Sequence, residues 1–163
     1  EITERDWSSD VCSSDLPGSI YAFCFEVDCP DPCRKYHITA DLESARAVAD
    51  LVLPYLKSTN IYHKVVQNRT FLCQQTSGIH RSSRGKFITI YMPPELGEKN
   101  RTMTGLFTTL LRAAEGGVKP GPRPLLRHQD YKPDQTIIFE KPVYLAPMNK
   151  TFIFGGYVCD PKD

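Results

Sequence analysis

The sequence predicts a single α+β domain, in which a mostly antiparallel sheet carries its helices packed on one face. Short segments with apolar residues at every second position alternate with two longer segments that have apolar residues at helical spacing. The last two predicted strands follow each other with no helix between them, which is typical of antiparallel pairing. A length of 163 residues suits one domain.

The first half of the chain predicts two strands and a long helix. Residues 21–27 alternate in part, and residues 35–40 follow as a second strand after a Pro-containing turn. Asp41 can then cap a helix that covers residues 41–58. We expect Pro54 to kink this helix, because proline removes a backbone donor inside the helical ladder.

The middle of the chain predicts two more strands. Residues 61–66 form the first, and residues 86–92 form the strongest strand of the chain, which ends at Pro93. Between them, a polar segment around residues 71–72 can form a helix.

The last third predicts a second long helix, a loop and two strands. Residues 95–114 place apolar side chains on one helical face, and Gly116 ends that helix. Residues 118–133, rich in Pro and Arg, are expected to be loop, and residues 136–139 and 152–158 to be strands.

The N-terminal segment differs from the rest in kind. Residues 1–16, with their repeated Ser-Ser-Asp, look like a translated sequencing adapter, so we expect a non-native segment followed by one domain over residues 17–163. Without this segment Lys and Arg fall from 20 to 19 and Asp and Glu from 19 to 14, so the net charge rises from +1 to +5. Five of the 6 cysteines remain, and an odd number argues against a closed disulfide framework.

Composition limits the classes of partner. A mild positive charge permits an anionic ligand without requiring nucleic acid, and no apolar run is long enough for a membrane helix. We therefore expect neither a nucleic-acid nor a membrane partner. The sequence supports no Walker A loop, Rossmann glycine fingerprint or Ser-His-Asp triad.

Two predicted strands carry residues suited to acid–base chemistry. Lys35 and His37 are two positions apart and so share one face of a strand. A bound phosphate dianion would favour the imidazolium form of His37, which can protonate a leaving oxygen. Lys64 lies in an otherwise apolar strand, where burial or nearby cations would lower its pKa toward that of a general base. The structural alternatives are a partly buried His and a solvent-facing Lys on edge strands.

Two basic segments are candidates for anion binding. Arg81, Arg84 and Lys86 lie among small residues in a predicted turn, where backbone N–H groups and guanidinium groups can both reach an anion. Arg123 and Arg127 lie in a Pro-rich loop, whose rigidity lowers the entropy cost of clamping a ligand. The alternatives are a solvated hairpin turn and a surface crossover.

A zinc site is a competing hypothesis for the N-terminal part of the domain. Cys24, Cys29, Cys33 and His37 could supply three thiolates and one imidazole. Their spacing is not that of a common zinc module, and this hypothesis would assign His37 a structural role.

Four motifs, in the same order and at similar spacing, resemble one superfamily. Residues 35–40 resemble the Lys-x-His-[Val/Ile]-Ser motif of the phosphothreonine lyases, which include type III secreted effectors and the N-terminal lyase domains of class III and IV lanthipeptide synthetases. Residues 81–91 resemble the Arg-x-Ser-x-Gly-Lys-Phe-Ile-Thr-Val-Tyr stretch of the synthetase domains. Residues 120–123 and 131–133 resemble their Gly-Pro-Arg and Tyr-Arg-Pro elements.

The resemblance implies β-elimination of phosphate from phosphothreonine or phosphoserine in a peptide or protein, without a metal or cofactor. It implies that Lys64 is the base that removes the α-proton and that His37 is the acid that protonates the leaving phosphate. Arg81 would bind the phosphate, Tyr91 would supply a hydroxyl to the catalytic site, and Lys35 would be a further phosphate ligand. A cytoplasmic protein or a secreted effector would fit this implied family.

The sequence departs from the resemblance in its C-terminal strands, where the superfamily has a further arginine. No arginine follows Arg127, so either Arg127 or Lys141 takes its place, or phosphate binding is weakened, or the activity is lost. The resemblance of residues 120–123 separately implies Arg123 as a further phosphate ligand. The alternative function is therefore a catalytically degenerate domain of the same fold that binds phosphopeptides or another partner.

Overall fold

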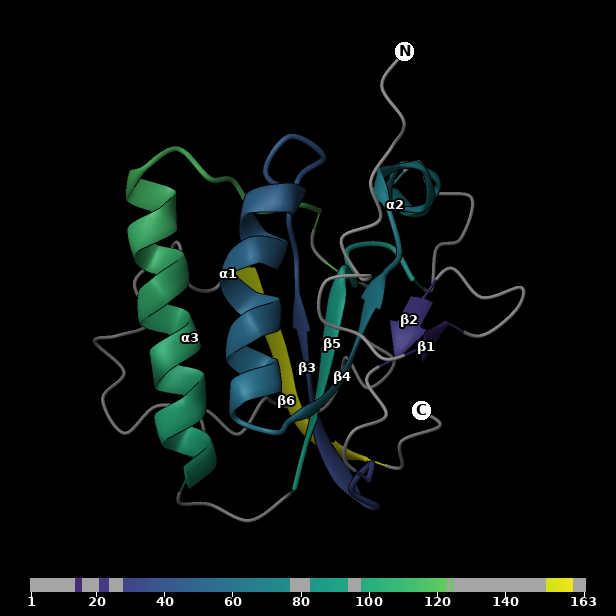
Figure 1. The fold of residues 1–163 in the computed structure, drawn as a ribbon, viewed down its shortest axis with the longest axis vertical. Helices are drawn as coiled ribbons and strands as arrows, with labels where there is room; N and C mark the ends of the chain where they lie inside the picture. Colours follow the sequence, from purple (N-terminus) through teal and green to yellow (C-terminus); the bar gives the residue numbers. More distant parts are fainter. Residues whose placement is uncertain are drawn as a thin grey trace.

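Figure 1 shows the computed structural model, which describes residues 14–15, 21–23, 28–76, 83–93, 98–122, 124 and 152–159. These residues contain six strands and three helices. In chain order they are β1 (Ser14–Asp15), β2 (Tyr21–Phe23), β3 (Cys33–Ile38), α1 (Ala45–Ser58), β4 (Tyr62–Val66), α2 (Arg69–Thr76), β5 (Ile88–Met92), α3 (Glu98–Glu115) and β6 (Ile153–Cys159).

The strands form one sheet in the order β1-β2-β4-β5-β3-β6. Each pair of neighbouring strands runs antiparallel. Two of these pairings place β4, β5 and β3 next to one another, although the helices separate them in sequence. This arrangement confirms the predicted α+β class with an antiparallel sheet.

One face of the sheet is covered by α1 and α3, which lie side by side (Figure 1). Alternate side chains of the central strands meet these helices in a continuous apolar core, and burying each such aliphatic side chain contributes about 1.5–3 kcal/mol. The core includes Tyr36 and Ile38 of β3, Val65 of β4, Ile88 and Ile90 of β5, Val48, Val52 and Leu53 of α1, and Met103, Leu106 and Leu110 of α3. The short helix α2 follows β4 and lies beyond the end of that strand (Figure 1).

The start of α1 differs from the expectation that Asp41 caps it. The helix begins at Ala45, and the Asp41 carboxylate instead accepts a hydrogen bond of 2.7 Å from the backbone N–H of Ser44 in the turn before it. The Ser44 hydroxyl is occupied elsewhere, because it accepts a bond of 2.8 Å from the backbone N–H of Lys119. Pro54 lies inside the helix, as expected.

The other elements lie at or close to their predicted positions. The segment around residues 71–72 is helical, and the Asn68 side chain caps it by accepting a bond of 3.0 Å from the N–H of Phe71. The predicted strand at residues 136–139 lies outside the described residues. Ser14–Asp15 pairs with β2, and the adapter origin of residues 1–16 stays a prediction. No helix in the described ranges is long and apolar enough to cross a membrane.

The turn before β5 packs directly against the Pro-rich loop after α3. Gly85 has a φ of +79°, and a Cβ there would overlap the carbonyl oxygen of Pro122 and lie 2.8 Å from the nitrogen of Pro124. The same loop is tied to the end of β3, because the Gly121 N–H donates a bond of 3.1 Å to the Thr39 hydroxyl. The described parts of the two basic segments therefore meet in space at Gly85, where a side chain would collide with the Pro-rich loop.

Candidate active site

The face of the sheet opposite α1 and α3 carries a row of polar side chains. Lys64 of β4 lies opposite Thr89 of β5, and Thr89 lies opposite His37 of β3. Because side chains alternate along a strand and Val65 and Ile88 face the helices, these three side chains share the other face. Strands are about 4.8 Å apart, so the row brings His37 and Lys64 to within about 10 Å of each other.

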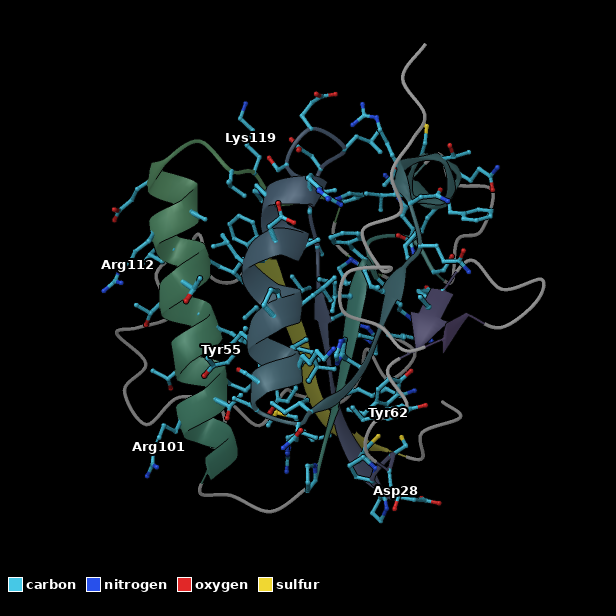
Figure 2. All side chains as sticks on the ribbon, viewed as in Figure 1. Asp28, Tyr55, Tyr62, Arg101, Arg112 and Lys119 are labelled. Atoms are coloured by element: carbon cyan, nitrogen blue, oxygen red, sulfur yellow. The ribbon has the colours of Figure 1, made fainter. Side chains whose placement is uncertain are left out.

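A second row lies two residues along the same face. Tyr62 of β4 is opposite Tyr91 of β5, and Tyr91 is opposite Lys35 of β3. The rings of Tyr62 and Tyr91 meet edge to face, with centroids 5.3 Å apart, and the Lys35 ammonium lies 5.4 Å from the Tyr91 centroid. In Figure 2, Tyr62 lies on the far side of the strands from α3, whereas Tyr55 lies between α1 and α3.

Lys64 is held between aromatic rings and other cations. Its Nζ lies 4.2 Å from the centroid of the Tyr21 ring and 5.9 Å from that of Tyr91. Burial, and then the charges of Lys35 and Lys86, lower the pKa of Lys64 from 10.5 to about 8. About one molecule in ten then carries a neutral amine at pH 7, compared with about one in three thousand for an ordinary lysine. Lys64 can therefore accept a proton at neutral pH.

His37 is 3% exposed, and its Nδ1 lies 3.1 Å from the hydroxyl of Thr89. Burial, followed by the charges of Lys86, Lys35 and Lys64, lowers the pKa of His37 well below 6.5. The imidazole is therefore neutral at pH 7 in this structure. The Thr89 hydroxyl can donate to a bare Nδ1 or accept from a protonated one, so it suits both forms of the ring.

Tyr91 supplies a buried phenol to the same face. Burial first, and then the nearby Cys29 and Tyr62, raise the pKa of Tyr91 far above its usual value. The hydroxyl thus stays protonated at all physiological pH values. Cys33, which is fully buried, packs against the ring in a small cluster separate from the main core.

Comparison with known proteins assigns the chain to a family. Residues 24–122 match the family described as RamC, N-terminal domain. The chain belongs to this family. No curated protein sequence matches the chain. Among solved structures, it is similar to the type III effector/phosphothreonine lyase OspF from Shigella flexneri, with 14% identity over 91% of this chain and 69% of that one and a TM-score of 0.56. At this identity the likeness shows a shared lyase-like fold.

The structure brings together four of the residues singled out from sequence. Lys35, His37, Lys64 and Tyr91 lie on one face of three adjacent strands, as described above, and their catalytic roles stay predictions. The predicted phosphate ligands Arg81, Arg123 and Arg127 lie outside the described residues.

Two contributors to this face were not selected from sequence, Thr89 and Tyr21. Lys86, which the sequence predicts as part of an anion-binding turn, directly follows Gly85 and lowers the pKa of both His37 and Lys64. Thr89 and Tyr21 contact His37 and Lys64, but their roles depend on strand pairing that the sequence does not reveal. Arg84, which has no counterpart in the resemblance, is exposed.

The zinc hypothesis fails on geometry. Cys33 and His37 lie four residues apart on β3, and a strand rises about 3.3 Å per residue, so their side chains emerge about 13 Å apart. A zinc ion holds its ligands at about 2.0–2.3 Å, so these two cannot share one ion. Within the described part of the chain, no three metal-ligating side chains gather at one point.

Proposed function

We propose that this chain is a phosphothreonine or phosphoserine lyase-like domain, which removes phosphate from a phosphopeptide or phosphoprotein by β-elimination. One observation carries the proposal: Lys64, Thr89 and His37 form a single cross-strand row on one face of the sheet. In this row a lysine with a lowered pKa and a buried histidine face the same side. The family assignment and the fold shared with a phosphothreonine lyase support the same chemistry. No metal or cofactor takes part in the proposed reaction.

The proposed reaction needs one base and one acid. The neutral amine of Lys64 takes the α-proton of the phosphorylated residue, and the released electron pair forms the double bond between Cα and Cβ. The bond between Cβ and the phosphate oxygen breaks, and His37 delivers a proton to that oxygen. The products are a dehydroamino acid and inorganic phosphate, with Lys64 protonated and His37 neutral.

The cations around His37 make its acidity depend on the substrate. Burial holds the pKa of His37 down first, and the charges of Lys86, Lys35 and Lys64 lower it further. A phosphate dianion bound among them would offset these charges, so the pKa of His37 would rise and the ring would take up a proton. Arg81 remains the predicted arginine ligand of the phosphate, with Arg123 and Arg127 as further candidates. His37 would then become an acid only when a substrate is present.

A non-catalytic phosphopeptide-binding domain is the second candidate. It is favoured by the absence of any arginine after Arg127 in the sequence, where the resembled superfamily has a phosphate ligand. Such a domain would use the same cationic face for binding and would leave the phosphopeptide intact.

Incubation with phosphothreonine peptides, followed by mass spectrometry, separates these functions. Elimination yields a peptide that is lighter by one water than the product of simple dephosphorylation. We expect this product from the wild type, none from Lys64→Ala, and wild-type turnover from Lys57→Ala, which removes an exposed lysine at the end of α1. Binding without a mass change would support the second candidate and refute the first, and plain dephosphorylation would refute both.

A further inference from the structure

Tyr21 presents its ring to the proposed base from the neighbouring strand. In the pairing of β2 with β4, Tyr21 lies opposite Val66 and Phe23 lies opposite Lys64, so Tyr21 and Lys64 are diagonal neighbours on one face. Aromatic and long side chains reach each other across such a diagonal. The Lys64 Nζ lies 4.2 Å from the Tyr21 centroid, which is closer than its 5.9 Å to Tyr91.

A buried glutamine fixes the position of this ring. Gln75 of α2 is fully buried, and its amide nitrogen donates bonds of 3.1 Å to the Tyr21 hydroxyl and 3.2 Å to the carbonyl oxygen of Lys86. A carbonyl oxygen only accepts, so the amide nitrogen must face Lys86 and the orientation of the amide is determined. Gln67, between β4 and α2, donates a further bond of 3.3 Å to the backbone carbonyl of Tyr21. Tyr21 is therefore held at both its backbone and its hydroxyl.

We propose that Tyr21 is a positioning residue for Lys64: its ring holds the ammonium on the polar face, and Gln75 holds the ring. The inference rests on the proposed role of Lys64 as the base. An aromatic face attracts a cation and has little attraction for a neutral amine. The ring thus strengthens Lys64 as a base, because it stabilises the ammonium that forms when the α-proton is taken.

The groups that face Lys64 divide into two opposing sets. The ammonium groups of Lys35 and Lys86, from β3 and from the turn before β5, lower its pKa together with burial. The rings of Tyr21 and Tyr91, from β2 and β5, act in the opposite direction by favouring the charged form. The neutral His37 completes the surroundings on β3. Tyr21 thus limits how far the cationic site weakens its own base.

Titration of Lys64 in variants of Tyr21 tests this proposal directly. The pKa of Lys64 can be followed by NMR on isotope-labelled lysine side chains, with its signal assigned by its loss in Lys64→Met. Removing the ring in Tyr21→Leu should lower that pKa by about one, whereas Tyr21→Phe keeps the ring and should change it by less than about 0.3. Tyr55→Leu, the same change between α1 and α3, should leave it unaltered. An equal pKa in Tyr21→Leu and the wild type would overturn the proposal.

Fluorinated phenylalanines at position 21 provide a second test without a change of shape. Each added fluorine withdraws electron density from the ring face, so the pKa of Lys64 should fall in steps from mono- to trifluorinated rings. A pKa that stays constant along this series would show that the ring only fills space. Gln75→Leu should lower the pKa by less than Tyr21→Leu does, and an unchanged pKa there would overturn the role assigned to Gln75.

The same variants keep this inference separate from the proposed function. If the wild type eliminates phosphate, the limiting rate at high pH should fall about threefold in Tyr21→Leu and much less in Tyr21→Phe, because the rate follows only part of the loss in basicity. If the wild type eliminates nothing, the proposed function fails while the titrations still decide whether the ring controls Lys64.

Discussion

Replacing Lys64 by methionine should make the protein more stable at neutral pH while removing its proposed activity. Methionine keeps a long unbranched side chain against the Tyr21 and Tyr91 rings but carries no charge. The wild type must hold an ammonium in a half-buried place beside Lys35 and Lys86. That cost disappears in the variant.

The size of the gain follows from the pKa of Lys64. Holding the protonated lysine in the fold costs about 3 kcal/mol, because its pKa falls from 10.5 to about 8 and each unit is worth about 1.4 kcal/mol. Lys64 keeps some contact with solvent, and water screens charges there, so we expect a net gain of about 1–2 kcal/mol at pH 7. The free energy of unfolding should rise by this amount.

The pH dependence gives the sign of the effect. Between about 8 and 10.5 the unfolded chain still binds the Lys64 proton and the folded protein has released it, so wild-type stability rises with pH through this window. The advantage of Lys64→Met should therefore be complete below pH 8 and should shrink as the pH approaches 10.5.

Urea unfolding of both proteins at pH 7 and at pH 10 measures this difference. Lys57→Met is the matched control, because Lys57 is exposed, and its effect should be small and equal at both pH values. The reasoning is refuted if Lys64→Met is no more stable than the wild type at pH 7. It is also refuted if the difference between the two is the same at pH 7 and pH 10.

Three further predictions concern the turn and the histidine. Gly85→Ala should destabilise the protein by about 2–4 kcal/mol in urea unfolding, because it adds an overlap with the Pro122 carbonyl to the strain of a positive φ. Gly117→Ala, at a φ of +101° with open space around it, should lose only about 1 kcal/mol, and equal losses would contradict the packing argument. Thr89→Val should slow elimination about fivefold to tenfold, whereas Thr89→Ser should not, because only serine keeps a hydroxyl at His37 Nδ1. Equal rates in the two variants would show that this hydrogen bond does not contribute to catalysis. Below pH 6.5 the unfolded chain binds a proton at His37 that the folded protein does not, so the free energy of unfolding should fall as the pH drops. His37→Gln should make the free energy of unfolding depend less on pH in this range, and an unchanged slope would contradict the lowered pKa of His37.

Most of the fold could be predicted from the sequence, because local patterns decide it. The alternation in residues 86–92 and the helical spacing in residues 95–114 each reflect one buried face, and β5 and α3 lie there. The start of α1 was misplaced because an aspartate caps a turn as well as it caps a helix, and Asp41 caps the turn before α1. The Ser44 hydroxyl in that turn binds the backbone of Lys119, a distant contact that the local sequence does not reveal. Strand order involves such distant contacts throughout, so it could not be derived from local patterns.

The candidate site was only partly accessible to sequence reasoning. Lys35 and His37 share a face by simple alternation along one strand, which a reader of the sequence can count. That Lys64 faces the same side depends on the register between β4 and β5. Tyr21 and Gln75 come from elements with weak local signals, so their contacts appear only once the sheet and α2 are assembled.

The row of Lys64, Thr89 and His37 also helps to fix the register of the sheet. A slip of β4 by one residue would turn the Lys64 ammonium toward the apolar layer beneath α1 and α3 and would lift Val65 out of it. Burying that charge without a partner would cost several kcal/mol, so the shifted pairing is strongly disfavoured. The side chains with proposed catalytic roles therefore also destabilise pairings in which the strands are out of register. A variant that removes Lys64 gains stability but loses one of the features that favour the correct register.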